Sequence, residues 1–247
     1  MTKQLKAVVL AAGKGTRLYT NDSDAPKVMR EACGKPLLWY VLEALSFIEK
    51  KDIILVVGYK KESVTSCFTG YPYAVQKEQL GTGHAVMAAK DELENHNGAL
   101  LVCYGDMPAI KRDVYEKLLQ THFEERNDCT ILTGESKLQM SFGRILRDEN
   151  GGFLHVIEEK DCTPEQLEIT ELNTGVYVFD TAKLLSALKE LKNDNAQGEY
   201  YITDVPAIMK GHAAKIGLYK RNLGDDIIGV NTLPQLEMVE RILSVER

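Results

Sequence analysis

The chain has 247 residues, of which 44% are hydrophobic and 27% are charged. These values are ordinary for a globular protein and exclude the collagen-like, disordered and membrane-spanning classes. The net charge of −6 argues against wrapping nucleic acid, which requires a basic face. We therefore expect one large domain with an appendage, and neither a nucleic acid nor a membrane as partner.

Cysteine and histidine spacing gives no sign of disulfides or zinc. The five cysteines are widely spaced and include no CxxC pair, which is typical of reduced thiols. The five histidines lack metal-ligand spacing. The longest early apolar run, AVVLAA (7–12), is too short for a signal peptide or a membrane span. We therefore expect a cytoplasmic protein.

Short apolar runs alternate with amphipathic stretches in the first half of the chain. Strands are indicated at AVVLAA (7–12), IILVVG (53–58) and ALLVCYGD (99–106). The runs 53–58 and 99–104 are nearly all apolar, which predicts central strands covered on both faces. This alternation predicts βαβ units on a mostly parallel sheet. The helical patterns lie at 37–50, 83–93 and 115–123.

From about residue 128 the pattern becomes richer in strands. Within 142–161, Asn150-Gly151 predicts a hairpin, because its turn requires positive φ. Helical patterns return at 181–191, 205–210 and 233–247. We expect an α/β fold: a Rossmann-like three-layer sandwich with a mixed, mostly parallel sheet, a β-rich second half and a projecting C-terminal helix. Residues 1–230 would form the domain and residues 231–247 a C-terminal helical arm.

The stretch LAAGKGTRL (10–18) directly follows the first predicted strand. It matches neither the Walker loop, GxxxxGK[ST], nor the dinucleotide-binding fingerprint, GxGxxG, but it shares the physical features by which both bind phosphate. Gly13 and Gly15 let backbone N–H groups approach a ligand, and Lys14 and Arg17 add positive charge. Ligands of open α/β sheets bind at the carboxyl ends of strands, where this turn lies. It is either a phosphate-binding loop or an ordinary turn with basic surface residues.

Three further segments carry candidate site residues. Lys27, after Pro26, either adds a cation to the same anion or is a solvated loop lysine. Asp106 ends a buried strand, which suits either a Mg²⁺ ligand or a cap of the next helix.

The third segment is QKEQLGTGH (76–84). Gln76 and Gln79 carry amides of the kind that read a planar base, and Gly81 and Gly83 allow close approach of the backbone. The alternative is a helix N-terminus capped by Thr82. We expect His84 to pack or cap rather than to catalyse.

Nine motifs occur in the order found in sugar-1-phosphate nucleotidyltransferases. They are LAAGKGTRL, PKV, GKPLL, QKEQLGTGHA, YGDMP, FGRI, ELNTGVYVFD, NDNAQGEYYITD and GVN. The chain resembles this family over essentially its whole length. It is most similar to the uridylyltransferase branch that makes UDP-N-acetylglucosamine, because NDNAQGEYYITD (193–204) and QLGTGHA are specific to that branch.

The resemblance implies a role for each residue at a matching position. The nucleotide contacts fall on Leu10, Ala11, Ala12, Gly13, Lys14, Gln76, Gly81, Thr82, Tyr104, Gly105 and Asp106. The catalytic basic residues fall on Arg17 and Lys27, and the magnesium ligands on Asp106 and Asn231. The sugar contacts fall on Gly143, Glu158 and Asn173, with Tyr201 and Thr203 flanking them. Alternatively, Asn173 merely starts a strand and Glu158 belongs to a solvated run of charges.

The activity that the resemblance implies is uridylyl transfer from UTP to N-acetylglucosamine 1-phosphate with Mg²⁺ as cofactor. Two features depart from the branch. Arg17 and Lys27 are ten positions apart, which is more similar to glucose-1-phosphate nucleotidyltransferases, and Phe142 stands where tyrosine is common. Another sugar 1-phosphate such as glucose 1-phosphate therefore stays an alternative substrate. A non-catalytic nucleotide-sugar sensor is a further alternative, against which Lys27, Asp106 and Asn231 argue.

Bifunctional members of the branch continue into an acetyltransferase half, a left-handed β-helix that assembles as a trimer. No such half follows Arg247 in this sequence. We therefore expect no β-helix domain and no acetyltransferase activity, and the sequence leaves the oligomeric state open.

Overall fold

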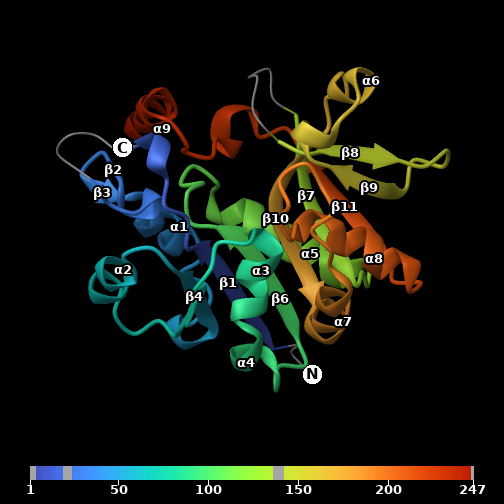
Figure 1. The fold of residues 1–247 in the computed structure, drawn as a ribbon, viewed down its shortest axis with the longest axis horizontal. Coiled ribbons are helices and arrows are strands. Elements are labelled where there is room, and N and C mark those ends of the chain that lie inside the picture. Colours follow the sequence, from blue (N-terminus) through green and yellow to red (C-terminus); the bar gives the residue numbers. More distant parts are fainter. Residues whose placement is uncertain (1–3, 19–23, 136–141, 246–247) are drawn as a thin grey trace.

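The computed structural model of the chain describes residues 4–18, 24–135 and 142–245. In these residues the strands form one nine-stranded sheet and a separate two-stranded ribbon (Figure 1). The strands are β1 (Leu5–Ala11), β2 (Glu31–Ala32), β3 (Lys35–Pro36), β4 (Ile53–Val57), β5 (Tyr73–Val75), β6 (Ala99–Tyr104), β7 (Cys129–Gly134), β8 (Arg144–Arg147), β9 (Phe153–Ile157), β10 (Leu172–Asp180) and β11 (Ile216–Arg221).

The sheet is mixed but mostly parallel, as the sequence predicts. Its path runs β11-β7-β10-β6-β1-β4-β5. β1 pairs in parallel with β4 and β6, and β11 pairs in parallel with β7. β10 is antiparallel to both of its neighbours, β6 and β7. The start of β10 therefore lies at the edge where β1 and β6 end.

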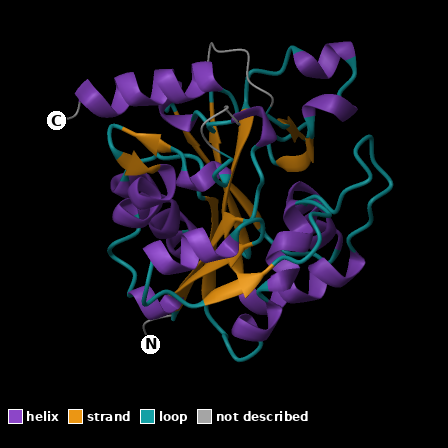
Figure 2. Cartoon of the chain, turned by 60° about the vertical axis from the view of Figure 1, so that its left-hand side comes forward, coloured by secondary structure: helices purple, strands orange, loops and turns teal. Residues whose placement is uncertain are grey.

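Helices cover both faces of this sheet (Figure 2). The α-helices are α1 (Leu37–Ala44), α2 (Lys61–Cys67), α3 (Thr82–Ala88), α4 (Lys90–Leu93), α5 (Arg112–Glu124), α6 (Pro164–Leu167), α7 (Thr181–Ala187), α8 (Val205–Gly211) and α9 (Leu233–Val245). The 3₁₀ helices are η1 (Thr16–Leu18), η2 (Lys27–Met29), η3 (Lys50–Asp52), η4 (Glu159–Asp161), η5 (Leu188–Glu190), η6 (Ile202–Asp204) and η7 (Gly224–Ile227).

Two buried clusters explain the three layers. Alternate residues of β1 point to opposite faces, so Val9 joins the core with α1, α5 and α9, while Val8 joins the core with α3, α7 and α8. Both valines are fully buried, which fits a strand covered on both faces. The predicted Rossmann-like three-layer sandwich is confirmed.

The predicted hairpin is also present. β8 and β9 pair antiparallel, and Gly151 in their turn has φ +77°. The Asp148 carboxylate accepts hydrogen bonds from the N–H groups of Asn150 and Gly152, at 3.1 and 2.8 Å. The hairpin extends away from the main sheet beside α6 (Figure 1).

The C-terminal helix does not project as expected. Val239 and Leu243 of α9 are buried in the same core as α1. At the ribbon of β2 and β3, the N–H of Cys33 donates to the Glu240 carboxylate at 3.2 Å. The helix lies against the body because its apolar stripe is covered there, which the sequence pattern alone does not specify. The division of the chain at residue 230 stays a prediction.

All five cysteines are free thiols in the structure. Among the described residues, no helix combines the length and the apolar composition that a bilayer crossing requires.

Candidate functional site

Two neighbouring cavities open at the carboxyl ends of β1 and β6. Their volumes are about 220 and 200 Å³, and both are lined by Lys27, Tyr104 and Asp106. We call the first the sugar-side cavity and the second the base-side cavity, after the residues that the sequence assigns to each. The three shared residues lie where ligands in the two cavities would meet.

The base-side cavity contains most of the predicted nucleotide contacts. Beyond the shared residues, it is lined by Leu10, Ala12, Gly13, Val28, Gln76, Gln79, Gly81, Thr82, Ala85 and Glu199. Ala11 and Gly105 are buried behind this lining. The N–H of Gly105 donates to the Leu10 carbonyl at 2.9 Å, so it supports the lining from β6.

The Gln76 side chain is fixed before any ligand binds. It is 5% exposed, and its Nε2 donates to the Gly81 carbonyl at 3.0 Å. The same nitrogen lies 3.2 Å from Nδ1 of His84. His84 therefore holds the amide in place, which agrees with the packing role expected for it. Because its rotamer is held, Gln76 presents its amide to the cavity at little entropic cost.

The loop around Gly81 lies against the segment that carries the branch-specific motif. Gly81 has φ +110°, and a Cβ atom there would lie 2.6 Å from the Tyr200 carbonyl oxygen. The N-cap of α3 is Gly81, and Thr82 makes no capping bond; its hydroxyl instead accepts from the N–H of Ile202 at 3.1 Å. The suggested cap by Thr82 is therefore wrong, since its oxygen is used to join two distant segments.

Lys27 forms the centre of the shared region. Its ammonium lies 2.5 Å from the Asp106 carboxylate and donates to the Asn231 amide oxygen at 2.9 Å. Asp106 is 6% exposed, so this ion pair is largely removed from water. Asp106 does not cap α5, whose N-cap is Lys111. The structure thus brings together Lys27, Asp106 and Asn231, which are between 79 and 204 positions apart in the sequence.

The glycine-rich loop has a packing role toward the same lysine. Gly15 has φ +67°, and a Cβ atom there would lie 2.6 Å from Cβ of Lys27. Gly13 lies farther off, since its Cβ would be 3.7 Å from Cε of Lys27. The close contact with Lys27 therefore requires a glycine at position 15. The sequence had suggested only that Gly15 lets a ligand approach the backbone.

The sugar-side cavity is formed by segments far apart in the chain. Beyond the shared residues, it is lined by Met107, Phe142, Gly143, Glu158, Asn173, Thr174, Gly175, Thr203, Gly229 and Asn231. Asn173 does more than start a strand: its amide nitrogen donates to the Tyr177 hydroxyl at 2.8 Å, and its amide oxygen accepts from the N–H of Gly175 at 3.2 Å. These bonds fix the irregular start of β10, where the register with β7 shifts.

Glu158 is half-buried and faces this cavity instead of lying in a solvated run of charges. Burial raises the pKa of its carboxyl group, the neighbouring Thr203 side chain partly offsets this, and the carboxylates of Asp204 and Asp161 raise it further. Burial also raises the pKa of the Tyr104 phenol well above its usual range. Tyr104 therefore stays neutral at physiological pH and offers a hydrogen bond, not a charge.

Several predicted residues lie outside the two cavities. Arg17 is exposed on η1 and lines neither of them. Lys14 lines a separate open groove of about 730 Å³, together with Lys61 and Lys77. Tyr201 is buried and lines neither cavity, and its hydroxyl accepts from Gln197 at 2.9 Å. The roles proposed for these three residues remain predictions.

The sequence assigned no role to several residues that line the cavities. On the sugar side these are Met107, Phe142, Thr174, Gly175 and Gly229. On the base side they are Val28, Ala85 and Glu199. Each lies within one of the nine motifs, so its place beside an assigned residue was an available signal. Gly175 also has φ +78°, and a Cβ atom there would lie 2.1 Å from Cε2 of Tyr104, which explains the glycine.

The residues around Lys27 fit a magnesium ion. The oxygens of Asp106 and Asn231 converge on one positively charged group, the Lys27 ammonium. Mg²⁺ prefers oxygen ligands and takes few of them from protein, leaving the others to phosphates and water. A carboxylate and an amide oxygen at the junction of two cavities provide such a partial set.

Comparisons with known proteins agree with the motifs. A family model described as nucleotidyl transferase matches residues 6–222. The bifunctional protein GlmU of Lactobacillus johnsonii is 44% identical over 237 residues, which are 96% of this chain and 51% of that protein. GlmU of Caldanaerobacter subterraneus subsp. tengcongensis is 43% identical over 242 residues, which are 98% of this chain and 52% of that protein. The chain thus spans about half the length of the curated relatives it matches.

A solved structure shows the same fold. The crystal structure of a UDP-glucose pyrophosphorylase complexed with UDP-glucose superposes with a TM-score of 0.78 at 20% sequence identity. The match covers 99% of this chain and 100% of that chain.

Proposed function

Because the chain belongs to the nucleotidyl transferase family, we propose that it catalyses Mg²⁺-dependent uridylyl transfer from UTP to N-acetylglucosamine 1-phosphate. The products would be UDP-N-acetylglucosamine and pyrophosphate. The observation that carries the proposal is the pair of adjacent cavities sharing Lys27 and Asp106. Two substrates whose phosphates must meet require such a shared charged junction.

The base-side cavity would hold UTP. Gln76 presents a fixed amide, and the backbone of Gly81 lies beside it, which suits hydrogen bonds to the edge of uracil. The sugar-side cavity would hold the sugar phosphate, with Asn173 and Glu158 facing its hydroxyl and acetamido groups. The phosphates of both substrates would then lie against Lys27.

The chemistry asks the protein for alignment and charge stabilisation. A sugar phosphate is already an anionic nucleophile, so no general base is needed. Lys27 places a positive charge between the cavities and stabilises charge on the α-phosphate as it is attacked. Asp106 and Asn231 would hold Mg²⁺, which when bound neutralises phosphate charge. Arg17 and Lys14, on the loop after β1, would approach the leaving pyrophosphate.

Glucose 1-phosphate stays a second candidate substrate because of one observation. Arg17 and Lys27 are ten positions apart, and residues 19–23 between them lie outside the described residues. The choice of sugar therefore needs a direct comparison of substrates.

Pyrophosphate release tests the function. Purified protein is incubated with UTP, Mg²⁺ and one of three sugar 1-phosphates, which are those of N-acetylglucosamine, glucosamine and glucose. We expect the highest kcat/KM with N-acetylglucosamine 1-phosphate and no turnover when Mg²⁺ is chelated. Preference for glucose 1-phosphate would replace the proposed substrate, and binding of UTP without any pyrophosphate release would favour a sensor.

A further inference from the structure

The hairpin of β8 and β9 supplies two lining residues of the sugar-side cavity. Gly143 directly precedes β8 and Glu158 directly follows β9, so both lie at the base of the hairpin. Only one residue pair, Leu172 with Arg144, joins β8 to β10 in register. Two backbone hydrogen bonds of 2.9 Å flank it, from Asn173 to Gly143 and from Ile145 to Glu171. The backbone contact between the hairpin and the sheet is therefore short.

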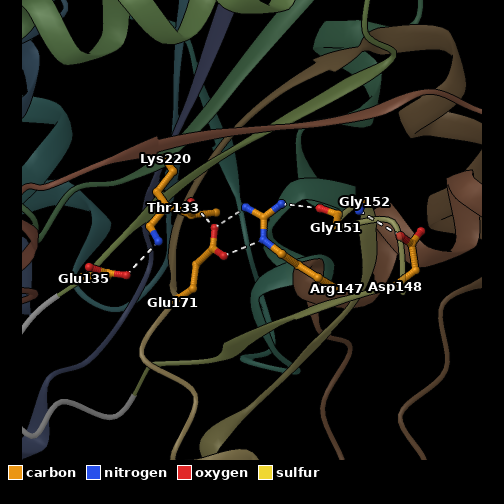
Figure 3. A network of polar contacts seen from close by, with 8 residues as sticks. All are labelled: Thr133, Glu135, Arg147, Asp148, Gly151, Gly152, Glu171 and Lys220. Atoms are coloured by element: carbon orange, nitrogen blue, oxygen red, sulfur yellow. Dashed lines mark hydrogen bonds and ion pairs between the residues drawn. The ribbon is translucent and has the colours of Figure 1, made fainter.

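An ion pair between a buried carboxylate and a partly exposed guanidinium reinforces this short contact. Arg147 of β8 donates to both carboxylate oxygens of Glu171, from Nε and from Nη2, each at 2.7 Å (Figure 3). The Thr133 hydroxyl of β7 donates to the same carboxylate at 2.7 Å. Glu171 is only 7% exposed, and a carboxylate with three short hydrogen bonds is held in one geometry.

The charges around Glu171 favour its ionised form. Burial raises the pKa of its carboxyl group, but the hydrogen bonds from Arg147 and Thr133 outweigh burial and hold the pKa below its usual value. Arg147 also reaches the turn, donating to the Gly151 carbonyl at 2.5 Å (Figure 3). One guanidinium thus connects the residue that precedes β10 with the turn of the hairpin.

We propose that Arg147 and Glu171 are positioning residues of the sugar-side cavity. By fixing the hairpin to β7 and β10, they hold Gly143 and Glu158 opposite Asn173, so that the cavity has the shape of its ligand before the ligand binds. The identity of that ligand as a sugar 1-phosphate rests on the proposed function. Neither Arg147 nor Glu171 lines the sugar-side or the base-side cavity, so their effect passes through the hairpin.

The geometry predicts an effect on one substrate only. No residue of the hairpin lines the base-side cavity. Loosening the hairpin therefore disturbs the contacts to the sugar and leaves the contacts to the nucleotide intact. A general loss of stability would instead act on both cavities, and this difference separates positioning from a merely structural role.

The test uses the full chain and the variants Glu171→Gln, Arg147→Gln and the double variant. We expect each single variant to raise KM for the sugar 1-phosphate about tenfold while KM for UTP and kcat stay within about twofold. The double variant should resemble the single ones, because both remove the same contact. The matched control is Val64→Ala, because the Val64 side chain is fully buried. Its helix, α2, lies on the opposite side of the molecule from the hairpin (Figure 1).

A second readout does not depend on activity. Hydrogen exchange of the amides in 144–157 should speed up in Glu171→Gln, whereas exchange in β1 and β6 should not change. Equal increases in both KM values, an unchanged KM for the sugar phosphate, or unchanged exchange in the hairpin each overturn the inference. If the wild-type protein releases no pyrophosphate, the proposed function fails. Hydrogen exchange and calorimetry then test the positioning role separately. In the variants, the affinity for UDP-N-acetylglucosamine should fall while the affinity for UTP stays unchanged.

Discussion

The base-side and sugar-side cavities are built by different means. The base-side cavity follows a simple rule of parallel sheets, because its lining comes mainly from the loops after β1 and β5 and from the start of α3. The sugar-side cavity requires the antiparallel β10, a hairpin that leaves the sheet, and the segment before α9. The base-side cavity thus depends on the carboxyl ends of the parallel strands, whereas the sugar-side cavity depends on elements added to the sheet.

The supports of the two cavities differ in the same way. Gln76 is held by Gly81 and His84, which lie five and eight positions away. The hairpin on the sugar side is held by Arg147 and Glu171, which are 24 positions apart. A cavity with local supports should tolerate changes elsewhere in the molecule better than one with distant supports.

The largest effect is expected where the two cavities meet. Lys27→Ala should lower kcat about a hundredfold or more, because it removes a preorganised positive charge that serves both phosphates. The measurement is steady-state pyrophosphate release, and Lys6→Ala is a control far from the junction, since Lys6 lies near the start of β1. A kcat within a factor of three of the wild type would remove Lys27 from the reaction.

A glycine replacement tests whether the sugar side needs its irregular strand. Gly175→Ala should lower the free energy of unfolding by about 2 kcal/mol, because the residue has φ +78° and the new methyl group would overlap the Tyr104 ring. Chemical denaturation measures the change. Gly211→Ala is the matched control, since a Cβ atom there meets nothing within 4 Å. Equal stabilities of the two variants would contradict the packing described here.

A pair of amide replacements should separate the two ligands. Gln76→Ala should raise KM for UTP about tenfold, the scale of one lost hydrogen bond to a polar ligand group, with little change in KM for the sugar phosphate. Asn173→Ala should do the reverse. Circular dichroism checks that both variants fold. If each variant raised both KM values equally, the cavities would not bind separate substrates.

The smallest effect concerns Glu158 and pH. Its pKa is raised in the folded state, so the folded protein holds the proton more strongly, and stability falls as pH rises from about 4.5 through the raised value. Glu158→Gln lacks this titration and should be more stable than the wild type at pH 7 but not at pH 4. Thermal unfolding across this pH range measures the difference. If the wild type were more stable than Glu158→Gln at pH 7, the pH dependence would have the opposite sign and the raised pKa of Glu158 would be refuted.

Sequence reasoning succeeded where residues act through their neighbours in the chain. Alternation of apolar runs located β1, β4 and β6, and Asn150-Gly151 located the hairpin, because these signals are local. It failed for α9, whose amphipathic pattern is the same whether the helix projects or packs. It also did not foresee the close contact of Gly15 with Lys27, twelve positions later, while the role of Gly15 toward a ligand stays a prediction.

The sequence by itself determined the fold class, the sheet edge that carries the site and most of the residues that line it. Hydrophobic periodicity and turn chemistry depend only on residues that are close together in the sequence, and the motifs occur in a fixed order along the chain. Only the tertiary structure decided that Lys27 lies between Asp106 and Asn231, and that Arg147 fixes the hairpin through Glu171. Such contacts depend on how strands from distant parts of the chain pair and twist, which no local pattern specifies.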